Sequence, residues 1–508
     1  MMVAPSHENA IRLSELLRGI VPVADCDDCL VTGIQLDSRN IESGDLFLAC
    51  RGSRVHGASH LGEALQRGAA AVIYDPEGAN GVHPLGIPAV AVEELSERLG
   101  ELAGRFYGFP SSDLQVIGIT GTNGKTSCSH YLAQALNRPT APCGIVGTAG
   151  SGLFGALEAS PNTTPDAVAI HSALASFRLA GAKEVVMEVS SHALDQGRVK
   201  GVAFNTAVFT NLAHDHLDYH GDMEAYESAK RRLFTWPGLE SIVVNVDDAA
   251  GRRLIREISA PVAVAYGLNA EAVTAAPAAS ASNIKRLWAE EVRLEREGFS
   301  IEVAGTWGSG TLRAPLPGRF NASNLMAVLA VLLVEGWALE KALQRLAETL
   351  PVPGRMERFG AAAGPQMVVD YAHTPGALQH ALTALHEHCE GDLWCVFGCG
   401  GDRDRGKRPL MGRIAEQWAQ HLVITDDNPR SENGDDIIRD ILDGLQHSDA
   451  ATVERDRDAA IRMAFERAAN DDLILVAGKG HEEYQEVAGK RLEQSDRAVA
   501  VALTEGSG

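Results

Sequence analysis

A glycine-rich segment from residue 118 to residue 126 has the composition of a phosphate-binding turn. The apolar run LQVIGIT leads into GITGTNGKT, and SCSHYLAQAL continues with the pattern of a helix. Glycines let backbone N–H groups face phosphate oxygens, Lys125 can bridge phosphates, and Thr126 can offer its hydroxyl to Mg²⁺. Ile119 replaces the first glycine of the common G-x-x-x-x-G-K-[ST] pattern, and Gly118 lies one residue earlier. We interpret the segment as an ATP phosphate loop, with a ligand-free strand-to-helix turn as the alternative.

A second set of polar side chains follows two apolar runs between residues 184 and 221. Glu188 lies near the end of the expected strand EVVMEV, where α/β sheets usually carry ligand groups, and its carboxylate could complete a Mg²⁺ site with Thr126. After FNTAVFT, the segment NLAHDHLDYHG places three histidines and two aspartates in the stretch from His214 to His220. A loop with so many polar side chains is more typical of a functional site than of a simple connection. Zinc is the alternative metal, although the spacing is not that of H-E-x-x-H.

Polar peptides also follow three expected strands near the C-terminus, namely CGGDRDRGKRP, TDDNPRSENGD and AGKGHEEYQ. In a parallel sheet all three lie at one edge. A zwitterionic amino acid with an extra carboxylate needs guanidinium groups for its acids and carboxylates for its ammonium. Arg403, Arg430, Asp427 and Glu482 supply both kinds of group. Taken singly, each could also be an ordinary surface charge.

The composition limits the kinds of partner that these sites can serve. The 508 residues are 45% hydrophobic and 22% charged, which is ordinary for a globular α/β protein, and the net charge of −22 disfavours nucleic acid and anionic membranes. The N-terminal run lacks the pattern of a secretion signal, and no later run reaches about 18 apolar residues, so we expect a cytoplasmic protein. The eight cysteines are expected to be reduced. Cys26 and Cys29 form a single C-x-x-C motif. We interpret them as two thiols near a surface turn rather than as a metal or redox site.

The elements that must position these residues predict an α/β protein of three domains. Residues 1–110 contain the short apolar runs GIQL, DLFLAC, AAAVIYD and AVAV and form a small N-terminal domain. Helix and strand alternate in longer units from 111 to 350, which predicts a P-loop-type ATPase domain with a mainly parallel sheet. Residues 351–508 contain four strand-like runs separated by helical segments, which predicts a Rossmann-like doubly wound sheet.

Several motifs in a fixed order then point to a family. GTNGKT, NTTPD, MEVSSHAL, DHLDYHG and MEAYESAKRRLF follow one another as in the Mur ligases, and the resemblance covers nearly the whole chain. It is most specific for the branch that extends UDP-N-acetylmuramoyl-L-alanyl-D-glutamate. The resemblance implies an ATP-dependent ligase of peptidoglycan precursor synthesis, with Mg²⁺ as cofactor. We expect it to be a monomer that neither binds nucleic acid nor inserts into membranes.

The resemblance also assigns roles to individual residues. The residues implied for catalysis are Lys125, Glu188, His216 and Lys230, and those implied for the metal are Thr126, Glu188, His216 and Lys230, with Lys230 carbamylated. Those implied for ATP are Gly121, Thr122, Asn123, Gly124, Lys125, Thr126, Ser127, Asn321, Asn324, Arg355 and Asp370. For Asn321, capping of the following helix is an alternative role.

Two substrate sites are implied in the same way. The residues implied for the UDP-muramoyl dipeptide are Leu36, Ser38, Ser53, Arg54, Val55, Asn162, Thr163, Thr164, Ser190, Gln196 and Arg198. Asp427-Asn428-Pro429-Arg430 resembles the D-N-P-R motif of ligases that accept meso-2,6-diaminopimelate. The residues implied for that amino acid are Arg403, Asp427, Asn428, Pro429, Arg430, Gly478 and Glu482.

The implied reaction is phosphorylation of the D-glutamate γ-carboxylate by ATP, followed by attack of the diaminopimelate amine on the acyl phosphate. An L-lysine-adding ligase and a folylpolyglutamate synthase-like enzyme are close alternatives. A non-catalytic ATP-binding switch and a zinc hydrolase centred on residues 214–220 are alternatives from other classes.

Overall fold

The computed structural model describes residues 10–52, 55–79, 86–160, 162–276, 284–295, 298–360 and 364–505. The chain divides into two compact units. The first contains the chain up to Tyr266 together with Glu271–Arg286, and the second contains Gly267–Ala270 and the chain from Leu287 onwards. The domain boundaries near residues 110 and 350 stay predictions.

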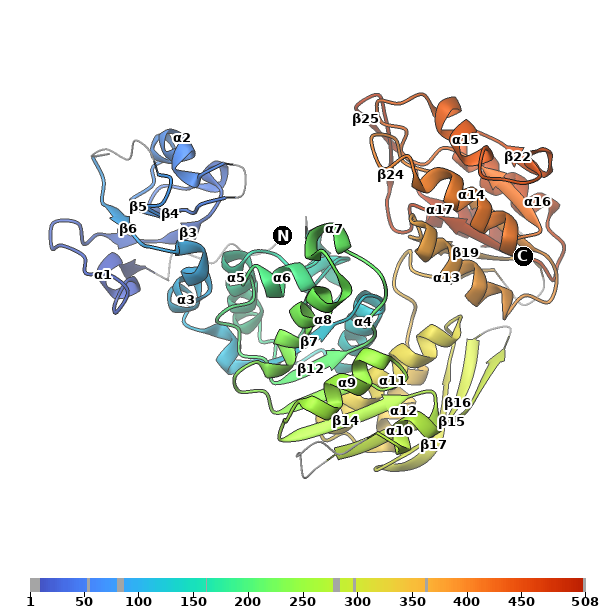
Figure 1. The fold of residues 1–508 in the computed structure, drawn as a ribbon, viewed down its shortest axis with the longest axis horizontal. Helices are drawn as coiled ribbons and strands as arrows, with labels where there is room; N and C mark the ends of the chain where they lie inside the picture. Colours follow the sequence, from blue (N-terminus) through green and yellow to red (C-terminus); the bar gives the residue numbers. More distant parts are fainter. Residues whose placement is uncertain are drawn as a thin grey trace. The chain divides into compact units, whose positions relative to one another are not determined.

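The N-terminal part of the first unit contains a small parallel sheet, whose strand order is β3-β4-β5-β6 (Figure 1). Its strands are β3 (Gly33–Gln35), β4 (Asp45–Ala49), β5 (Ala71–Tyr74) and β6 (Ala89–Ala91), and a short antiparallel pair is formed by β1 (Ile11–Arg12) and β2 (Leu30–Val31). Its helices are α1 (Leu13–Leu16), α2 (Leu61–Gln66) and α3 (Leu95–Phe106). The apolar side of α3 shares a core with Val168 and Ala175 of α5 (Ala167–Leu179), which ties this part to the rest of the unit.

The strands at the centre of the first unit are part of an eleven-stranded sheet and follow the order β10-β9-β8-β11-β7-β12-β13-β14 within it. The parallel strands are β7 (Gln115–Thr120), β8 (Gly144–Gly147), β11 (Glu184–Glu188), β12 (Thr206–Phe209), β13 (Ser241–Asn245) and β14 (Val262–Gly267), and the antiparallel edge is β9 (Gly150–Leu153) and β10 (Ala156–Glu158). The helices are α4 (Lys125–Leu136), α5 (Ala167–Leu179), α6 (Ser191–Asp195), α7 (Leu217–His220), α8 (Met223–Arg231), α9 (Ala249–Glu257) and α10 (Ala270–Thr274).

The strand order around β7 explains where a ligand can bind in this sheet. β7 pairs in parallel with β11 on one side and with β12 on the other, so Glu188 lies opposite Ile119 and Phe209 opposite Thr120. The loops that follow these three strands therefore begin at one sheet edge, where the chain connections change direction. Open α/β sheets bind their ligands at such a point.

The second unit begins with an antiparallel segment rather than with further alternation of helix and strand. β15 (Ile284–Glu295), β16 (Gly298–Gly305) and β17 (Gly308–Ala314) pair as an antiparallel meander, followed by α11 (Arg319–Val334) and α12 (Leu339–Ala347). The predicted alternation up to residue 350 is therefore wrong for residues 284–314. Too few residues of sequence separate these strands for a crossover helix, so the strands can only pair antiparallel.

The C-terminal part of the second unit is a six-stranded sheet with the order β18-β19-β23-β20-β21-β22. Its strands are β18 (Glu357–Phe359), β19 (Gln366–Asp370), β20 (Leu393–Phe397), β21 (His421–Ile424), β22 (Ala451–Val453) and β23 (Leu473–Ala477), and all pairs except β18–β19 are parallel. The helices are α13 (Pro375–His386), α14 (Lys407–Trp418), α15 (Gly434–Leu442), α16 (Arg457–Arg467) and α17 (Asp496–Glu505), and a hairpin is formed by β24 (Tyr484–Val487) and β25 (Lys490–Glu493).

Helices cover both faces of this sheet, as the doubly wound prediction requires. Val368 and Phe397 share a core with α13, α14 and α15, whereas Met367 and Val396 share a core with α16 and α17. Neighbouring residues of one strand thus point to opposite faces, and both faces are apolar. The predicted α/β class and its doubly wound C-terminal sheet are confirmed (Figure 1).

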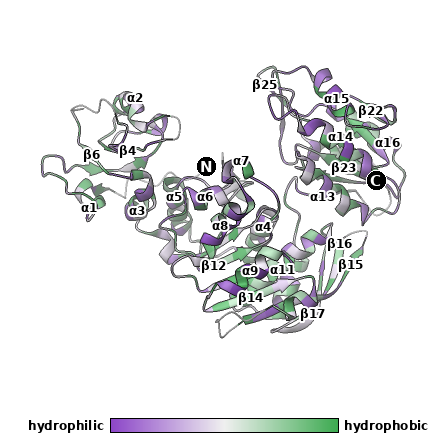
Figure 2. Cartoon of the chain, in the orientation of Figure 1, coloured by the Kyte–Doolittle hydropathy of each residue, from purple (hydrophilic) through white to green (hydrophobic). Residues whose placement is uncertain are grey.

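Hydropathy follows the same layers. In Figure 2 hydrophobic residues run along strands such as β14, and hydrophilic residues mark surface helices such as α9. Among the described residues, no helix combines the length and the apolar character needed to cross a membrane.

Candidate active site

The glycine-rich segment lies between β7 and α4, as predicted, and is held by the loop after β12. Gly121 and Gly124 have φ values of 147° and 83°, and a Cβ atom on Gly121 would collide with Thr210 Oγ1. The backbone N–H groups of Thr122 and Asn123 donate to the Asn211 carbonyl and side-chain oxygens, both at 2.9 Å. The turn therefore requires glycine and is fixed before α4 begins at Lys125. A helix N-terminus at such a turn favours phosphate.

Two lysines meet at one carbonyl of this loop. Lys125 Nζ donates to Gly121 O at 2.8 Å and Lys230 Nζ donates to the same oxygen at 2.9 Å. The side chain of Lys230 is buried, and burial, together with the charge of Lys125, lowers its pKa well below the usual value. Lys230 is therefore an amine that loses its proton far more readily than an exposed lysine.

Glu188 joins the phosphate loop to two neighbouring strands. Its buried carboxylate accepts hydrogen bonds from Thr126 Oγ1 at 3.0 Å, from Thr148 N at 2.9 Å and from Thr148 Oγ1 at 3.1 Å. The predicted pair of Thr126 and Glu188 is thus brought together. Thr148 has no predicted role, although its position just after β8, the neighbour of β11, is a signal that could have identified it.

His216 belongs to an aromatic cluster beside Lys230. Its ring centre lies 4.8 Å from that of His192 and 6.0 Å from that of Tyr226, while Lys230 Nζ lies 4.4 Å from the Tyr226 ring centre. The Tyr226 hydroxyl in turn lies 3.1 Å from Thr122 Oγ1 in the phosphate loop. Within the described ranges, no group of three or more His, Cys, Asp or Glu side chains is placed to hold a metal ion.

The residues predicted for the dipeptide end of the UDP substrate form a chain of hydrogen bonds that ends at Glu188. Thr148 Oγ1, which donates to the Glu188 carboxylate, lies 2.9 Å from Thr163 Oγ1, and Thr164 Oγ1 donates to the Glu188 carbonyl at 2.9 Å. Arg198 Nη1 donates to the Thr164 carbonyl at 3.0 Å.

Further members of the predicted set extend this network. Arg198 Nε donates to Gln196 Oε1 at 2.9 Å, and the Ser190 side chain caps α6 by accepting from Ala193 N. Asn162 is exposed in the same region.

The predicted uridine-end residues that the structure describes lie on segments that follow β3 and β4 of the small N-terminal sheet. Ser38 is buried and its hydroxyl donates to Glu63 at 2.6 Å, whereas Leu36 is half-buried and Val55 is exposed. The predictions for Ser53 and Arg54 fall outside the described residues.

In the second unit, the predicted adenine and hinge residues are held by backbone contacts. Asn321 and Asn324 are buried, and Asn321 Nδ2 donates to the Pro317 carbonyl at 2.9 Å. Gly318 is the N-cap of α11, so the alternative role of Asn321 as the capping residue is wrong. Asp370 accepts from Met356 N at 2.8 Å, and burial raises the pKa of its carboxyl. The Arg355 guanidinium lies 4.7 Å from the ring centre of Tyr371.

The predicted amino-acid site assembles at the carboxyl ends of β20, β21 and β23. Arg430 has a φ of 52°, an uncommon value for a residue with a side chain and one that is concentrated at functional sites. Its Nη1 donates to the Gly401 carbonyl at 2.8 Å, and its Nε lies 3.3 Å from Glu486 Oε2. Backbone hydrogen bonds to Glu486 and from Ala488 join this residue to β24. The guanidinium is therefore fixed from two sides.

Its predicted partners lie on the same loops. Asn428 Nδ2 donates to Glu482 Oε2 at 3.0 Å, and Asp427 and Pro429 are buried. Gly478 has a φ of 123°, and a Cβ atom there would lie 2.5 Å from Asp427 Oδ2, so only glycine fits. Arg403 is exposed on the loop after β20.

Two fully buried arginines that were not predicted support this edge of the sheet. Arg408 binds Glu432 at 2.9 Å and Asp440 at 2.8 Å, and it lowers the pKa of Glu432 to about 2. Arg457 donates to Asp496 at 2.7 Å and to the Ala477 carbonyl at 2.9 Å. These ion pairs fix the loops that carry the predicted amino-acid site.

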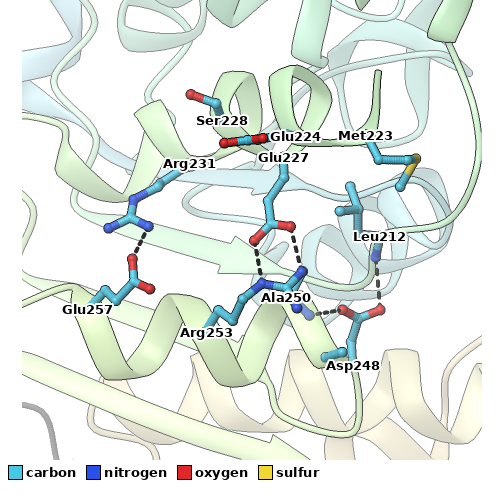
Figure 3. A pocket seen from close by; sticks show the side chains of 11 residues that line it. Leu212, Met223, Glu224, Glu227, Ser228, Arg231, Asp248, Ala250, Arg253 and Glu257 are labelled. Carbon is cyan, nitrogen blue, oxygen red and sulfur yellow. Dashed lines mark hydrogen bonds and ion pairs between the residues drawn. The ribbon is translucent and has the colours of Figure 1, made fainter.

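A pocket of about 760 Å³ lies between α8 and α9, and it is lined by none of the predicted residues. Figure 3 shows several of its charged groups in contact with protein partners: Arg253 faces Glu227, Arg231 faces Glu257, and Asp248 accepts from Leu212 N. Both arginines that line it are paired with glutamates of the protein, and we assign it no role in the reaction.

Comparison with known proteins connects these sites to a family. The chain matches three family models: the Mur ligase family, catalytic domain, at residues 30–107, the Mur ligase middle domain at 119–332, and the Mur ligase glutamate ligase domain at 354–480. It is 48% identical to the UDP-N-acetylmuramoyl-L-alanyl-D-glutamate--2,6-diaminopimelate ligase of Alkalilimnicola ehrlichii, over 98% of this chain and 100% of that protein. It is also 48% identical to the ligase of the same name from Pseudomonas aeruginosa, over 93% and 96% of the two chains.

Comparison with solved structures points to the same family. A ligase structure of the same name has a TM-score of 0.71 and 33% identity over 98% of this chain and 99% of that one. The MurF ligase of Thermotoga maritima in complex with ADP has a TM-score of 0.58 at 17% identity, over 87% and 93% of the two chains, and shows a shared fold. The chain therefore belongs to the Mur ligase family.

Proposed function

We propose that this chain is the ATP-dependent ligase that adds meso-2,6-diaminopimelate to the D-glutamate of UDP-N-acetylmuramoyl-L-alanyl-D-glutamate, in peptidoglycan precursor synthesis. The observation that carries the proposal is the set of fixed charges around Arg430, in a chain whose relatives bear that name over their full length. Arg430 offers a guanidinium to the distal carboxylate of the amino acid, and Glu482 and Asp427 offer carboxylates to its ammonium. L-lysine has no distal carboxylate to bind there.

At the ATP end, the glycine-rich loop and the N-terminus of α4 would bind the phosphates. Lys125, whose ammonium lies among the carbonyls of Gly121 and Thr122, would move onto the transferred phosphate. The charge that gathers where a carboxylate meets a triphosphate needs such fixed cations. We further propose that ATP contacts four residues of the second unit, namely Asn321, Asn324, Arg355 and Asp370.

Oxygen donors next to the loop fit Mg²⁺. Thr126 Oγ1 and the Glu188 carboxylate are in contact, and such hard donors suit this cation. His216 and Lys230 flank Tyr226, which contacts the same loop. When bound, Mg²⁺ would offset the negative charge of the reacting phosphate and carboxylate.

We also propose that Lys230 is carbamylated. Reaction with CO₂ requires a neutral amine, and burial lowers the pKa of this lysine. The product is an anion, which the neighbouring charge of Lys125 stabilises, and its remaining N–H can still donate to Gly121 O. Carbamylation would turn a buried cation into an oxygen donor beside the loop.

The reaction itself needs no covalent nucleophile on the protein. The γ-carboxylate of D-glutamate attacks the γ-phosphorus of ATP, and ADP leaves. The amine of diaminopimelate then attacks the acyl carbon, phosphate leaves, and the amine loses a proton. Thr163, Thr164, Ser190, Gln196 and Arg198 would hold the dipeptide during both steps. A cytoplasmic location, a monomeric state and closure of the domains stay proposals.

The function is tested with purified protein, ATP, Mg²⁺, the UDP-muramoyl dipeptide and one amino acid at a time. We expect phosphate release to require the dipeptide and to be at least about 100-fold faster with meso-diaminopimelate than with L-lysine, because only the former can pair with Arg430. Equal rates with the two amino acids would refute the assigned specificity. ATP binding without substrate-dependent phosphate release would favour the non-catalytic switch.

A further inference from the structure

Lys479 is a buried lysine at the proposed amino-acid site to which the reaction above assigns no role. It follows β23 and stands between Gly478 and Gly480, whose φ values are 123° and 54°. Its side chain is 0% exposed. Lysines are almost never fully buried unless their charge is paired, so the groups around this ammonium indicate why it is there.

The ammonium binds two of the residues proposed to contact diaminopimelate. Lys479 Nζ lies 3.1 Å from Asn428 Oδ1 and 3.2 Å from Glu482 Oε2. Asn428 Nδ2 also donates to Glu482 Oε2, at 3.0 Å. The three side chains therefore form a closed triangle, in which one carboxylate oxygen receives two donors. Asn428 Oδ1 also accepts from Glu486 N at 2.9 Å, which links the triangle to the strand that fixes Arg430.

This arrangement leaves one side of the Glu482 carboxylate available. Within the part of the chain that the structure describes, both hydrogen bonds to this carboxylate end on Oε2, and the side chain is 20% exposed. Oε1 can therefore accept from an incoming ammonium group. Lys479 Nζ cannot touch the substrate itself, since its whole side chain is enclosed and its remaining direction is towards the Tyr484 ring, 5.5 Å away.

The local charge balance also depends on Lys479. Glu482 shares this edge of the sheet with Asp427 and Asp496, which are 7% and 0% exposed. Asp496 is neutralised by Arg457 at 2.7 Å, so Lys479 is the cation that directly pairs with Glu482. Without it, Glu482 would carry an unpaired negative charge close to other carboxylates and would turn to solvent or take up a proton.

We infer that Lys479 is a positioning residue for the amino-acid substrate: it holds Glu482 and Asn428 so that the free oxygen of Glu482 faces the substrate ammonium. The inference rests on the proposed function and adds a residue to its specificity site. It places the effect of Lys479 on the binding of the amino acid and not on the ATP chemistry.

The test compares Lys479→Met with wild type by measuring KM for each of the three substrates. We expect KM for meso-diaminopimelate to rise at least about tenfold, because Glu482 loses its orientation, while KM for ATP and for the UDP-muramoyl dipeptide stay within about twofold. Arg497→Met is the matched control: it breaks the ion pair of Arg497 with Glu357 in the same unit, 2.6 Å in length, and should leave all three constants unchanged.

A double variant separates positioning from a general structural role. If Lys479 acts through Glu482, Lys479→Met combined with Glu482→Gln should be no worse for diaminopimelate than Glu482→Gln alone. Additive losses, equal rises in all three KM values, or an unchanged KM for diaminopimelate would each overturn the inference. Lys479→Gln, which keeps a hydrogen-bond donor in the same space, serves if methionine prevents folding. A wild-type enzyme with no diaminopimelate-dependent turnover would instead refute the proposed function.

Discussion

Replacing Lys230 by methionine is expected to lower kcat by a factor of about 10³, the upper range for losing one fixed electrostatic group at a reacting centre. Methionine preserves most of the buried volume, so the folded structure should persist, but the carbamate and its oxygen donors are lost. The measurement is phosphate release with all three substrates saturating. Because Lys230 shares the Gly121 carbonyl with Lys125, the loss should fall on the phosphate chemistry and leave KM for diaminopimelate unchanged.

Lys200→Met provides the control for this variant. Lys200 lies in the same unit, is partly exposed and pairs with Glu97 at the surface, so its loss should change kcat by less than about twofold. Carbamylation is checked separately, by removing CO₂ from the wild-type enzyme and then restoring bicarbonate. Activity that falls and returns supports the carbamate. A Lys230→Met enzyme with wild-type kcat would remove this lysine from the reaction.

Replacing Arg430 by alanine is the second large expected effect, and it concerns specificity. KM for meso-diaminopimelate should rise about 100-fold, since a carboxylate loses a bidentate, charge-assisted partner. KM for ATP should stay within about twofold because the Arg430 guanidinium contacts Gly401 and Glu486 and not the residues proposed for ATP. Arg430→Lys should recover only part of the loss, because an ammonium cannot reproduce the planar fork of a guanidinium.

Arg439→Ala is the matched control for Arg430. Arg439 is exposed on α15, a helix that packs on the C-terminal sheet, and it pairs with Asp436 at 2.9 Å. Its loss should leave both constants unchanged. If Arg430→Ala raised KM for ATP as much as KM for diaminopimelate, Arg430 would have no special part in choosing the amino acid.

The strands of the N-terminal sheet and of the six-stranded C-terminal sheet could be predicted from sequence, because each is a short apolar run followed by turn residues. DLFLAC and AAAVIYD became β4 and β5, and QMVVDYAH and DLILVAGKG became β19 and β23. The order of the strands within each sheet could not be predicted in the same way. β23 lies between β19 and β20, although β21 and β22 come before it in sequence. Apolar patterns show that a strand is buried, but not which strands lie beside it.

The same limit explains what was missed in the site. Gly121, Lys125 and Thr126 belong to one local motif, so their roles could be predicted together. Thr148 and Lys479 are single residues of common types. Strand pairing brings Thr148 to Glu188, and loop packing brings Lys479 to Asn428.

The family resemblance supplied Lys230, whose local sequence indicates only an exposed helical lysine. Its burial depends on the way α8 packs against the phosphate loop, which the helix sequence alone does not show.

The central claim is that ATP activates the D-glutamate γ-carboxylate before the amine attacks, and oxygen transfer tests it most directly. The UDP-muramoyl dipeptide is labelled with heavy oxygen in that carboxylate and is incubated with ATP, Mg²⁺ and meso-diaminopimelate. Mass spectrometry then follows the label. The acyl-phosphate route predicts one labelled oxygen in each phosphate released and one retained in the new amide. Amide product formed with unlabelled phosphate would contradict it.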